Sequence, residues 1–251
     1  MKQLFLTTIL LFPLTFTAAE DSPSAKDIIK QVVEANGGLD NFYRKDGVSY
    51  SYFYRAPDGK TDLSEEEYIF DGEKSSASYI VHEKHVSPDK TGLIKQVYDG
   101  KSTTVYHNEK PLLDPKAVKT ADFLRKTNYY WFAMMFKLLD EGSNYEYLGE
   151  HAVNDKKYHK VELTYEENVG DVSDRYLLFV NQDTMLIDFF LFTVMDFNLT
   201  DPLIMKLQYQ EIDDLLIPTH REYTQAVSWE NPIAANEDWV EEISLNIKFK
   251  N

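Results

Sequence analysis

The most apolar group of predicted strands lies between residues 174 and 209. Three apolar runs lie there, separated by turn-forming residues at 181–184 and 198–202. Apolar runs bounded by Asn, Asp and Pro are typical of strands, so we predict three antiparallel strands. The middle run, residues 186–197, is apolar at odd and even positions alike. Because successive side chains of a strand point to opposite faces, both faces of this strand must be covered.

A period of two residues predicts further strands on either side of this segment. They lie at residues 48–54, 66–70, 76–81, 94–98, 103–107, 158–165, 215–223 and 243–249, and Asp-Gly pairs mark several of the turns. Pro218 indicates an edge strand or a bulge. The total is about 11 strands, and antiparallel sheets of that size curl or close.

Two segments show helical spacing instead. Residues 25–36 place apolar side chains on one face; Ser24 and Asp27 resemble a capping box, and Gly37 and Gly38 favour a left-handed end. A further turn is expected at residues 39–42. Residues 117–139 contain no Gly or Pro, and Asp114-Pro115 is typical of a helix start. The second half of this segment, residues 129–136, is apolar almost all round, which predicts a buried helix. The chain is therefore predicted to be an α+β protein.

Composition narrows the class of protein. Residues 1–19 combine Lys2, an apolar run and small residues before a possible cut after Ala19, which is typical of a signal peptide. Residues 20–251 are then expected to form one exported domain. The formal charge of −16 argues against nucleic acid as a partner. Cysteine is absent, so no disulfide supports the fold, and no later apolar run is long enough to predict a transmembrane helix.

Five short motifs resemble an exported LolA-like family of bacterial proteins without an assigned function. They are Tyr-Trp-Phe (130–132), Phe-Lys-Leu-Leu-Asp (136–140), Val-Gly-Asp (169–171), Asp-Arg-Tyr (174–176) and Leu-Leu-Ile-Pro-Thr-His-Arg (215–221). Met135 stands where that family has a proline. The resemblance implies a periplasmic protein of Gram-negative bacteria similar to the LolA and LolB lipoprotein carriers. In that fold an open half-barrel, a large curved antiparallel sheet, holds helices over an apolar cavity on its concave face.

The expected ligand is hydrophobic: a lipid, or the acyl chain of an outer membrane lipoprotein. Ligand sites are mostly apolar concavities, and methionine adapts to varied partners. The candidates on the predicted interior face and the inserted helix are Tyr130, Trp131, Met134, Met135, Phe179, Phe189, Leu191, Met205 and Tyr209. A fully packed core would use the same residue types. No cofactor is expected.

The opposite face of the middle strand carries Phe190 and Phe192. Two adjacent exposed aromatic residues would mark a surface for an envelope protein or a second copy of the chain. The alternative is that the first helix or the chain termini cover them.

Other chemistry has less support in the sequence. His82 and His85 could bind a metal only with a third ligand, and residues three apart on a strand point to opposite faces, so no metal is predicted. Asp171, Asp174 and Arg175, or His220, could serve a glycan-active enzyme. Asp side chains in such loops more often bond to turn backbone. Nucleophile elbows and phosphate loops are absent from the sequence, so we predict a protein that is not an enzyme.

Overall fold

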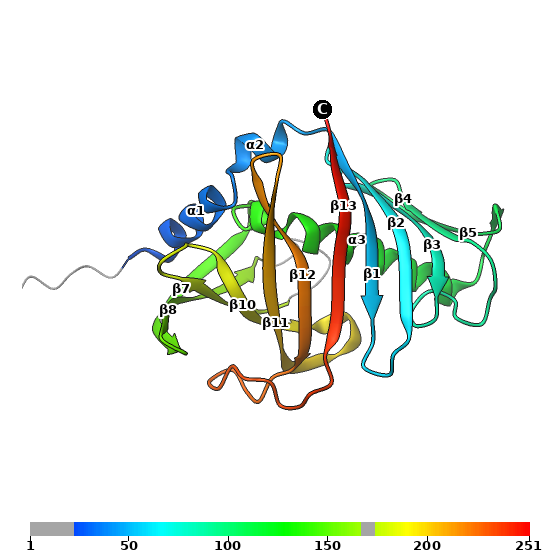
Figure 1. Cartoon of the computed structure of the whole chain (residues 1–251). Helices are drawn as coiled ribbons and strands as arrows, with labels where there is room; N and C mark the ends of the chain where they lie inside the picture. Colours follow the sequence, from blue (N-terminus) through cyan, green and yellow to red (C-terminus); the bar gives the residue numbers. More distant parts are fainter. Residues whose placement is uncertain (1–22, 167–173) are drawn as a thin grey trace, which may run out of the picture.

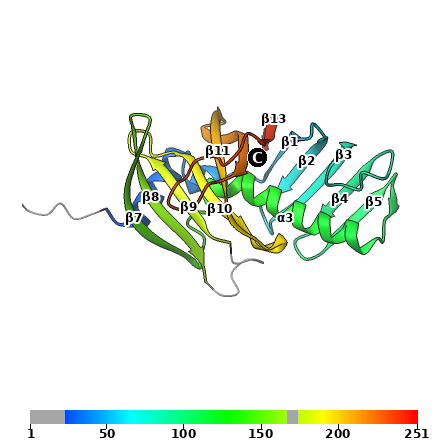
Figure 2. The ribbon, with the colours of Figure 1, turned by 90° about the horizontal axis from the view of Figure 1, so that it is seen from below.

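One antiparallel sheet dominates the fold. The computed structural model describes residues 23–166 and 174–251. Within them, 13 strands form a single sheet in the order β6-β5-β4-β3-β2-β1-β13-β12-β11-β10-β9-β8-β7. The sheet curves around α3, which lies along its concave face (Figure 2). The predicted α+β fold with a large curved antiparallel sheet is confirmed, with two more strands than the sequence indicated.

The strands divide into two groups that meet in the middle of the sheet (Figure 1). The first group is β1 (Gly47–Arg55), β2 (Thr61–Ile69), β3 (Lys74–His82), β4 (Ile94–Tyr98), β5 (Thr103–His107) and β6 (Lys110–Pro111). The second is β7 (Ser143–Val153), β8 (Lys156–Tyr165), β9 (Tyr176–Asn181), β10 (Ile187–Val194), β11 (Leu199–Ile212), β12 (Leu215–Gln225) and β13 (Val240–Lys250). β1 pairs with β13, and α3 (Pro115–Lys137) connects the two outer edges. The sequence did not indicate β6, which has two residues, or β7, whose side chains are mostly half-exposed.

The first helix, α1 (Ala25–Ala35), lies where the sequence predicted it, and α2 (Leu39–Tyr43) follows. Ser24 is the N-cap residue, but its side chain makes no capping bond, and Asp27 pairs with Lys30 at 2.8 Å instead. At Gly37 the backbone has a φ of +110°, and a Cβ atom would lie 2.5 Å from the Asp214 carbonyl oxygen. Only glycine fits that position. The buried side of α1, which joins the main core, consists of Ile28, Ile29, Val32 and Val33.

The predicted Asp114-Pro115 sequence stabilises the start of the inserted helix α3. Asp114 is the N-cap, its carboxylate accepts a hydrogen bond from the Lys116 amide at 3.0 Å, and Pro115 occupies the first helical position. Every residue from Trp131 to Phe136 is buried. This confirms that the second half of the helix is enclosed on all sides. Across the described ranges, no helix has both the length and the apolar character needed to cross a membrane.

The assignment of faces on β10 was wrong. Phe190 and Phe192 point into the main core and are 0% and 3% exposed, whereas Phe189 and Leu191 belong to a second cluster on the convex face. The cause is a β-bulge at Asp188: residue 187 pairs with Val180 but residue 189 pairs with Phe179. One extra residue reverses the direction of every later side chain.

The cover of the convex face also differs from the prediction. The segment between β12 and β13 contributes Ala226, Trp229 and Trp239 to the cluster over β9 to β11. The Arg175 guanidinium lies 4.1 Å from the centre of the Trp229 ring, and the Lys206 amine lies 4.0 Å from that of Trp239. Neither α1 nor the described chain ends form this layer. Since Phe190 and Phe192 are buried, they cannot form the predicted partner surface.

Candidate functional site on the concave face

The second half of α3 packs on β9 to β11 through aromatic rings. The Trp131 indole stacks on Phe190 with ring centres 5.5 Å apart and planes 22° apart, and it forms a T-shaped contact with Phe192 at 5.3 Å. Tyr176 of β9 closes the group at 6.1 Å from Trp131. Such contacts stabilise aromatic pairs by about 0.5–1.5 kcal/mol beyond the burial of their area. This cluster is the centre of the apolar interior.

Three methionine side chains belong to the same core as the aromatic cluster. Met134, Met135 and Met205 are each 1% exposed. The Tyr209 hydroxyl donates to the Ile187 carbonyl oxygen at 2.9 Å and lies 3.5 Å from the Met135 sulfur. Unbranched thioethers can change rotamer at low cost and follow the shape of a neighbour. Side chains fill the interior here, but the methionine side chains among them can change conformation.

The hydroxyl groups in this region remain neutral. Tyr130 and Tyr165 share a hydrogen bond between their hydroxyls. Burial raises the pKa of Tyr130 well above its usual value, and burial raises the pKa of Tyr165 to about 12. The apolar interior therefore contains no tyrosinate charge at neutral pH.

The first half of α3 is held to the sheet by ionic groups. The Arg125 guanidinium binds the Glu66 carboxylate, and both side chains are 0% exposed. Its Nε donates to Gln96 Oε1 at 3.0 Å and its Nη2 donates to the Tyr79 hydroxyl at 2.7 Å. The Ser64 hydroxyl also donates to Glu66 Oε1, at 2.7 Å. The concave face therefore has an ionic half under β2 to β4 and an apolar half under β9 to β11.

A second buried ion pair lies between these two halves. Arg221 of β12 donates from Nε to Glu242 of β13 at 2.8 Å. The sequence reasoning missed both ion pairs. The signal available was weak: three of the four inward positions of β2 are polar, namely Asp62, Ser64 and Glu66, and the fourth is Tyr68.

The structure brings six of the nine predicted ligand residues together. Tyr130, Trp131, Met134, Met135, Met205 and Tyr209 all belong to or pack on the main core. The prediction that Phe179, Phe189 and Leu191 share this interior is wrong, because the three lie in the cluster on the convex face. Phe179 stacks on Phe189 with ring centres 4.3 Å apart.

Two surface hollows lie away from this region. One of about 840 Å³ is formed by the turns at residues 58–60, 82–83 and 88–93, together with Ile80. The other, of about 510 Å³, lies between residues 200–202 and 225–229 and includes Ala235. None of the nine predicted ligand residues lines either hollow.

The two histidines weighed as metal ligands have other contacts. His82 Nε2 lies 2.8 Å from the Gly92 carbonyl oxygen, and the His85 ring packs on Tyr54 with centres 4.7 Å apart. Burial lowers the pKa of His85. Both rings therefore fill structural positions.

Asp174 and Arg175, which the sequence offered as possible catalytic residues, also make structural contacts. Asp174 accepts hydrogen bonds from the Thr193 hydroxyl and the Met195 amide, each at 2.9 Å, and burial raises its pKa. Arg175 pairs with Glu162. Asp171 lies outside the described residues, as does the predicted signal peptide. The arrangement of Asp174 and Arg175 gives the glycan-active alternative no support.

Comparison with known proteins identifies the family and the fold of the chain. The sequence profile of a family described as "Family of unknown function (DUF6503)" matches residues 3–203, and no curated protein matches the chain. A LolA superfamily protein from Nitrosomonas europaea superposes with a TM-score of 0.54 and 14% identity, over 92% of this chain and 95% of that one. A DUF1329 family protein from Desulfovibrio piger gives a TM-score of 0.50 at 12% identity, over 90% and 92%. The predicted LolA-like fold is confirmed.

Proposed function

Since this chain belongs to the DUF6503 family of unknown function and has a LolA-like fold, we propose that it is an exported, periplasmic binding protein for a hydrophobic ligand. The ligand is a lipid or the acyl chain of a lipoprotein, and residues 20–251 act as one domain. The acyl chain lies between the second half of α3 and strands β9 to β11. The observation that carries this proposal is the contact of Trp131 with Phe190 and Phe192, in a core that also contains three buried methionines.

The energetics favour an acyl chain as the occupant. Burial of each CH₂ group contributes about 0.8 kcal/mol. When α3 moves away from β9 to β11, the acyl chain takes the place of the contacts that Trp131 and the methionines lose, so these side chains stay out of water. The burial of the acyl chain itself then provides the driving force. Methionine side chains lower the cost of the rearrangement because they adapt to a new neighbour.

The two halves of α3 differ in how they can move. The Arg125 network binds the first half to β2, β3 and β4 through directional bonds among fully buried groups. Breaking such a network exposes unpaired charge and is costly. The second half is held mainly by apolar packing, which tolerates substitution of one apolar partner by another. Entry of the ligand beside residues 129–137 is therefore favoured over entry beside residues 115–125.

Tryptophan fluorescence can report on this location. The chain has three tryptophans: Trp131 in the interior, and Trp229 and Trp239 on the convex face. A variant with Trp229→Phe and Trp239→Phe keeps Trp131 as its only tryptophan. Dibromostearate, whose bromine atoms quench indole emission on contact, is expected to quench this variant saturably. The matched Trp131→Phe variant keeps only the convex-face indoles and is expected to show no saturable quenching.

Native mass spectrometry of the same samples gives the stoichiometry. We expect one acyl chain per protein in the unmodified chain and in both tryptophan variants. If no lipid is retained after exposure to dibromostearate or to phospholipid vesicles, the carrier function is wrong. If lipid is retained but only the convex-face tryptophans are quenched, the interior location is wrong.

A further inference from the structure

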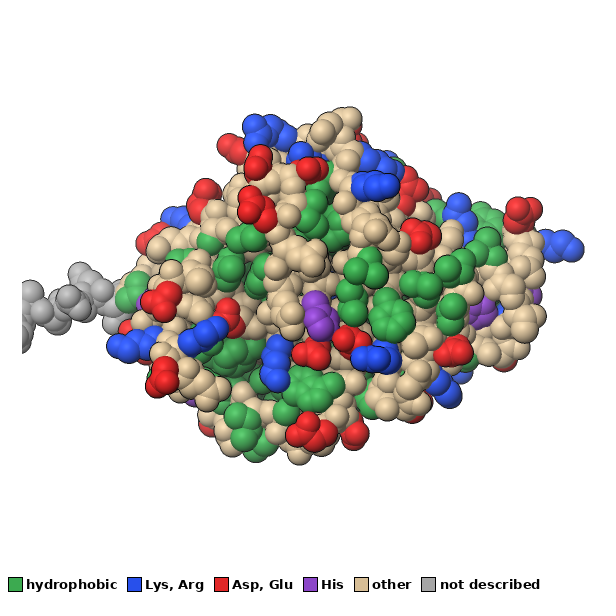
Figure 3. Space-filling model, in the orientation of Figure 1, with side chains coloured by type: hydrophobic (Ala, Val, Ile, Leu, Met, Phe, Trp, Pro, Cys, Tyr) green, Lys and Arg blue, Asp and Glu red, His purple; other side chains and the backbone are tan. Residues whose placement is uncertain are grey.

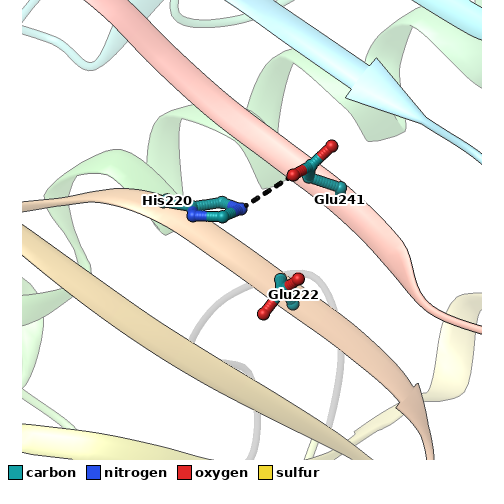
Figure 4. Close-up of side chains that lie close together, drawn as sticks. All are labelled: His220, Glu222 and Glu241. Carbon is teal, nitrogen blue, oxygen red and sulfur yellow. Dashed lines mark hydrogen bonds and ion pairs between the residues drawn. The ribbon is translucent and has the colours of Figure 1, made fainter.

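Three potential metal ligands meet on the convex face, on the opposite side of the sheet from α3. His220 and Glu222 extend from β12 and Glu241 extends from β13 (Figure 4). One ligand atom from each residue lies within 4.8 Å of the other two, and His220 Nε2 is 3.1 Å from Glu241 Oε1. Figure 3 shows a histidine with acidic side chains directly beside it near the middle of this face. The group is half-buried and open to solvent.

The strand register sets the two carboxylates against each other. Glu222 and Glu241 are direct partners across β12 and β13, and like charges directly opposite each other are destabilising. The nearby cations do not neutralise Glu222. Lys206 is its register partner on β11, but the Lys206 amine lies over the Trp239 ring, and Arg55 binds Glu241. In the described part of the chain, the Glu222 carboxylate has no ion pair or hydrogen bond.

We propose that His220, Glu222 and Glu241 bind one divalent transition-metal ion of the zinc type. Imidazole with carboxylate oxygens suits Zn²⁺ and its first-row neighbours, whereas Mg²⁺ and Ca²⁺ prefer sites made of oxygen alone. Three protein ligands leave a fourth position for water. The ion supplies the positive charge that Glu222 lacks, because the Lys206 amine lies over Trp239 and Arg55 pairs with Glu241.

The geometry requires a modest adjustment. In a tetrahedral site with metal–ligand distances of about 2.0–2.2 Å, the ligand atoms lie about 3.3–3.6 Å apart, so a separation of up to 4.8 Å must close by roughly 1 Å. Rotation of a half-exposed glutamate carboxylate provides that movement. Arg55 contacts Oε2 of Glu241 and leaves Oε1 to face His220. The guanidinium thereby fixes the orientation of a ligand, as outer groups do in known metal sites.

Calorimetric titration of the purified protein with Zn²⁺, without a polyhistidine tag, tests the site. We expect saturable binding of one ion per chain, no competition from Mg²⁺ or Ca²⁺, and at least tenfold weaker binding for His220→Ala and for Glu222→Gln. The control is His151→Ala on the edge strand β7, which is expected to bind Zn²⁺ as the unmodified chain does. Co²⁺ gives a second measurement, because its visible absorption reports the ligand set and should change only in the His220 and Glu222 variants.

Thermal unfolding in the presence of EDTA shows whether each variant is folded, and Glu222→Gln keeps the shape of the side chain. Saturating Zn²⁺ is expected to raise the midpoint of the unmodified protein and not that of Glu222→Gln. The proposal is overturned if no saturable binding occurs, if His220→Ala binds as tightly as the unmodified chain, or if His151→Ala loses binding as well. These outcomes are independent of acyl-chain binding, because the site lies outside the interior.

Discussion

Substitution of Arg125 by methionine is expected to lower the free energy of unfolding by about 3–5 kcal/mol, because it leaves the buried Glu66 carboxylate without its cation. Both side chains are 0% exposed, so water cannot solvate the remaining charge. Tyr79 and Gln96 also lose a donor, and each buried polar group left unpaired costs roughly 1–3 kcal/mol. These terms overlap, so we take the value for a broken buried ion pair as the estimate.

Urea unfolding at neutral pH, followed by circular dichroism, measures the effect. Arg55→Met is the matched control, since Arg55 also pairs with a glutamate but has a side chain 54% exposed; it should cost less than about 1 kcal/mol. A double variant, Arg125→Met with Glu66→Leu, should recover part of the loss because the unpaired charge is gone. If Arg125→Met costs no more than Arg55→Met, or if the double variant is no more stable than the single one, the ionic anchoring of α3 is refuted.

Two further predictions concern the side chains of Phe190 and His85. Phe190→Ser is expected to destabilise the protein by about 3–5 kcal/mol in urea unfolding, whereas Ile80→Ser, at a position 58% exposed, should change little; equal effects would place Phe190 outside the core. Burial lowers the pKa of His85 below its ordinary value of 6.5, so the unfolded chain takes up the proton first as the pH falls. This part of the stability is present above about pH 6.5 and is lost below it. His85→Gln should therefore reduce the fall in unfolding free energy between about pH 7 and pH 5, and an unchanged slope would contradict the assignment.

The sequence was sufficient for the fold because the period of two residues persists through most strands. It did not indicate β6 and β7, it assigned Phe179 of β9 to the wrong face, and it lost the alternation of β10 at one residue. Asp188 adds a position to the strand, so the alternation counted through residues 186–197 assigns Phe189 and Leu191 to the face that Phe190 and Phe192 occupy. Both faces of β10 are apolar, so hydrophobicity could not reveal the change of phase. A strand with one polar face would have shown it.

The covering of the convex face was unpredictable for a different reason. Trp229 and Trp239 lie in an irregular segment without a period, and their contacts with Arg175 and Lys206 join residues distant in the sequence. Likewise, the pairing of Arg125 with Glu66 connects a helix to a strand across the interior. Long-range pairs of this kind depend on how the sheet curves, which local patterns do not determine.

The adjacency of β1 and β13 affects how the protein folds. Gly47 pairs with Lys250, so the middle of the sheet joins residues from the two ends of the described chain. Contacts between residues so far apart in sequence slow folding. When the N-terminal part of the chain is available first, β1 to β6 can pair with one another. The open side of β1 has no partner until the 11 residues of β13 are also available. An unpaired strand edge is prone to aggregation. Assembly of this sheet therefore ends at its centre, and the newly made chain depends on its final strand to protect the edge of its first.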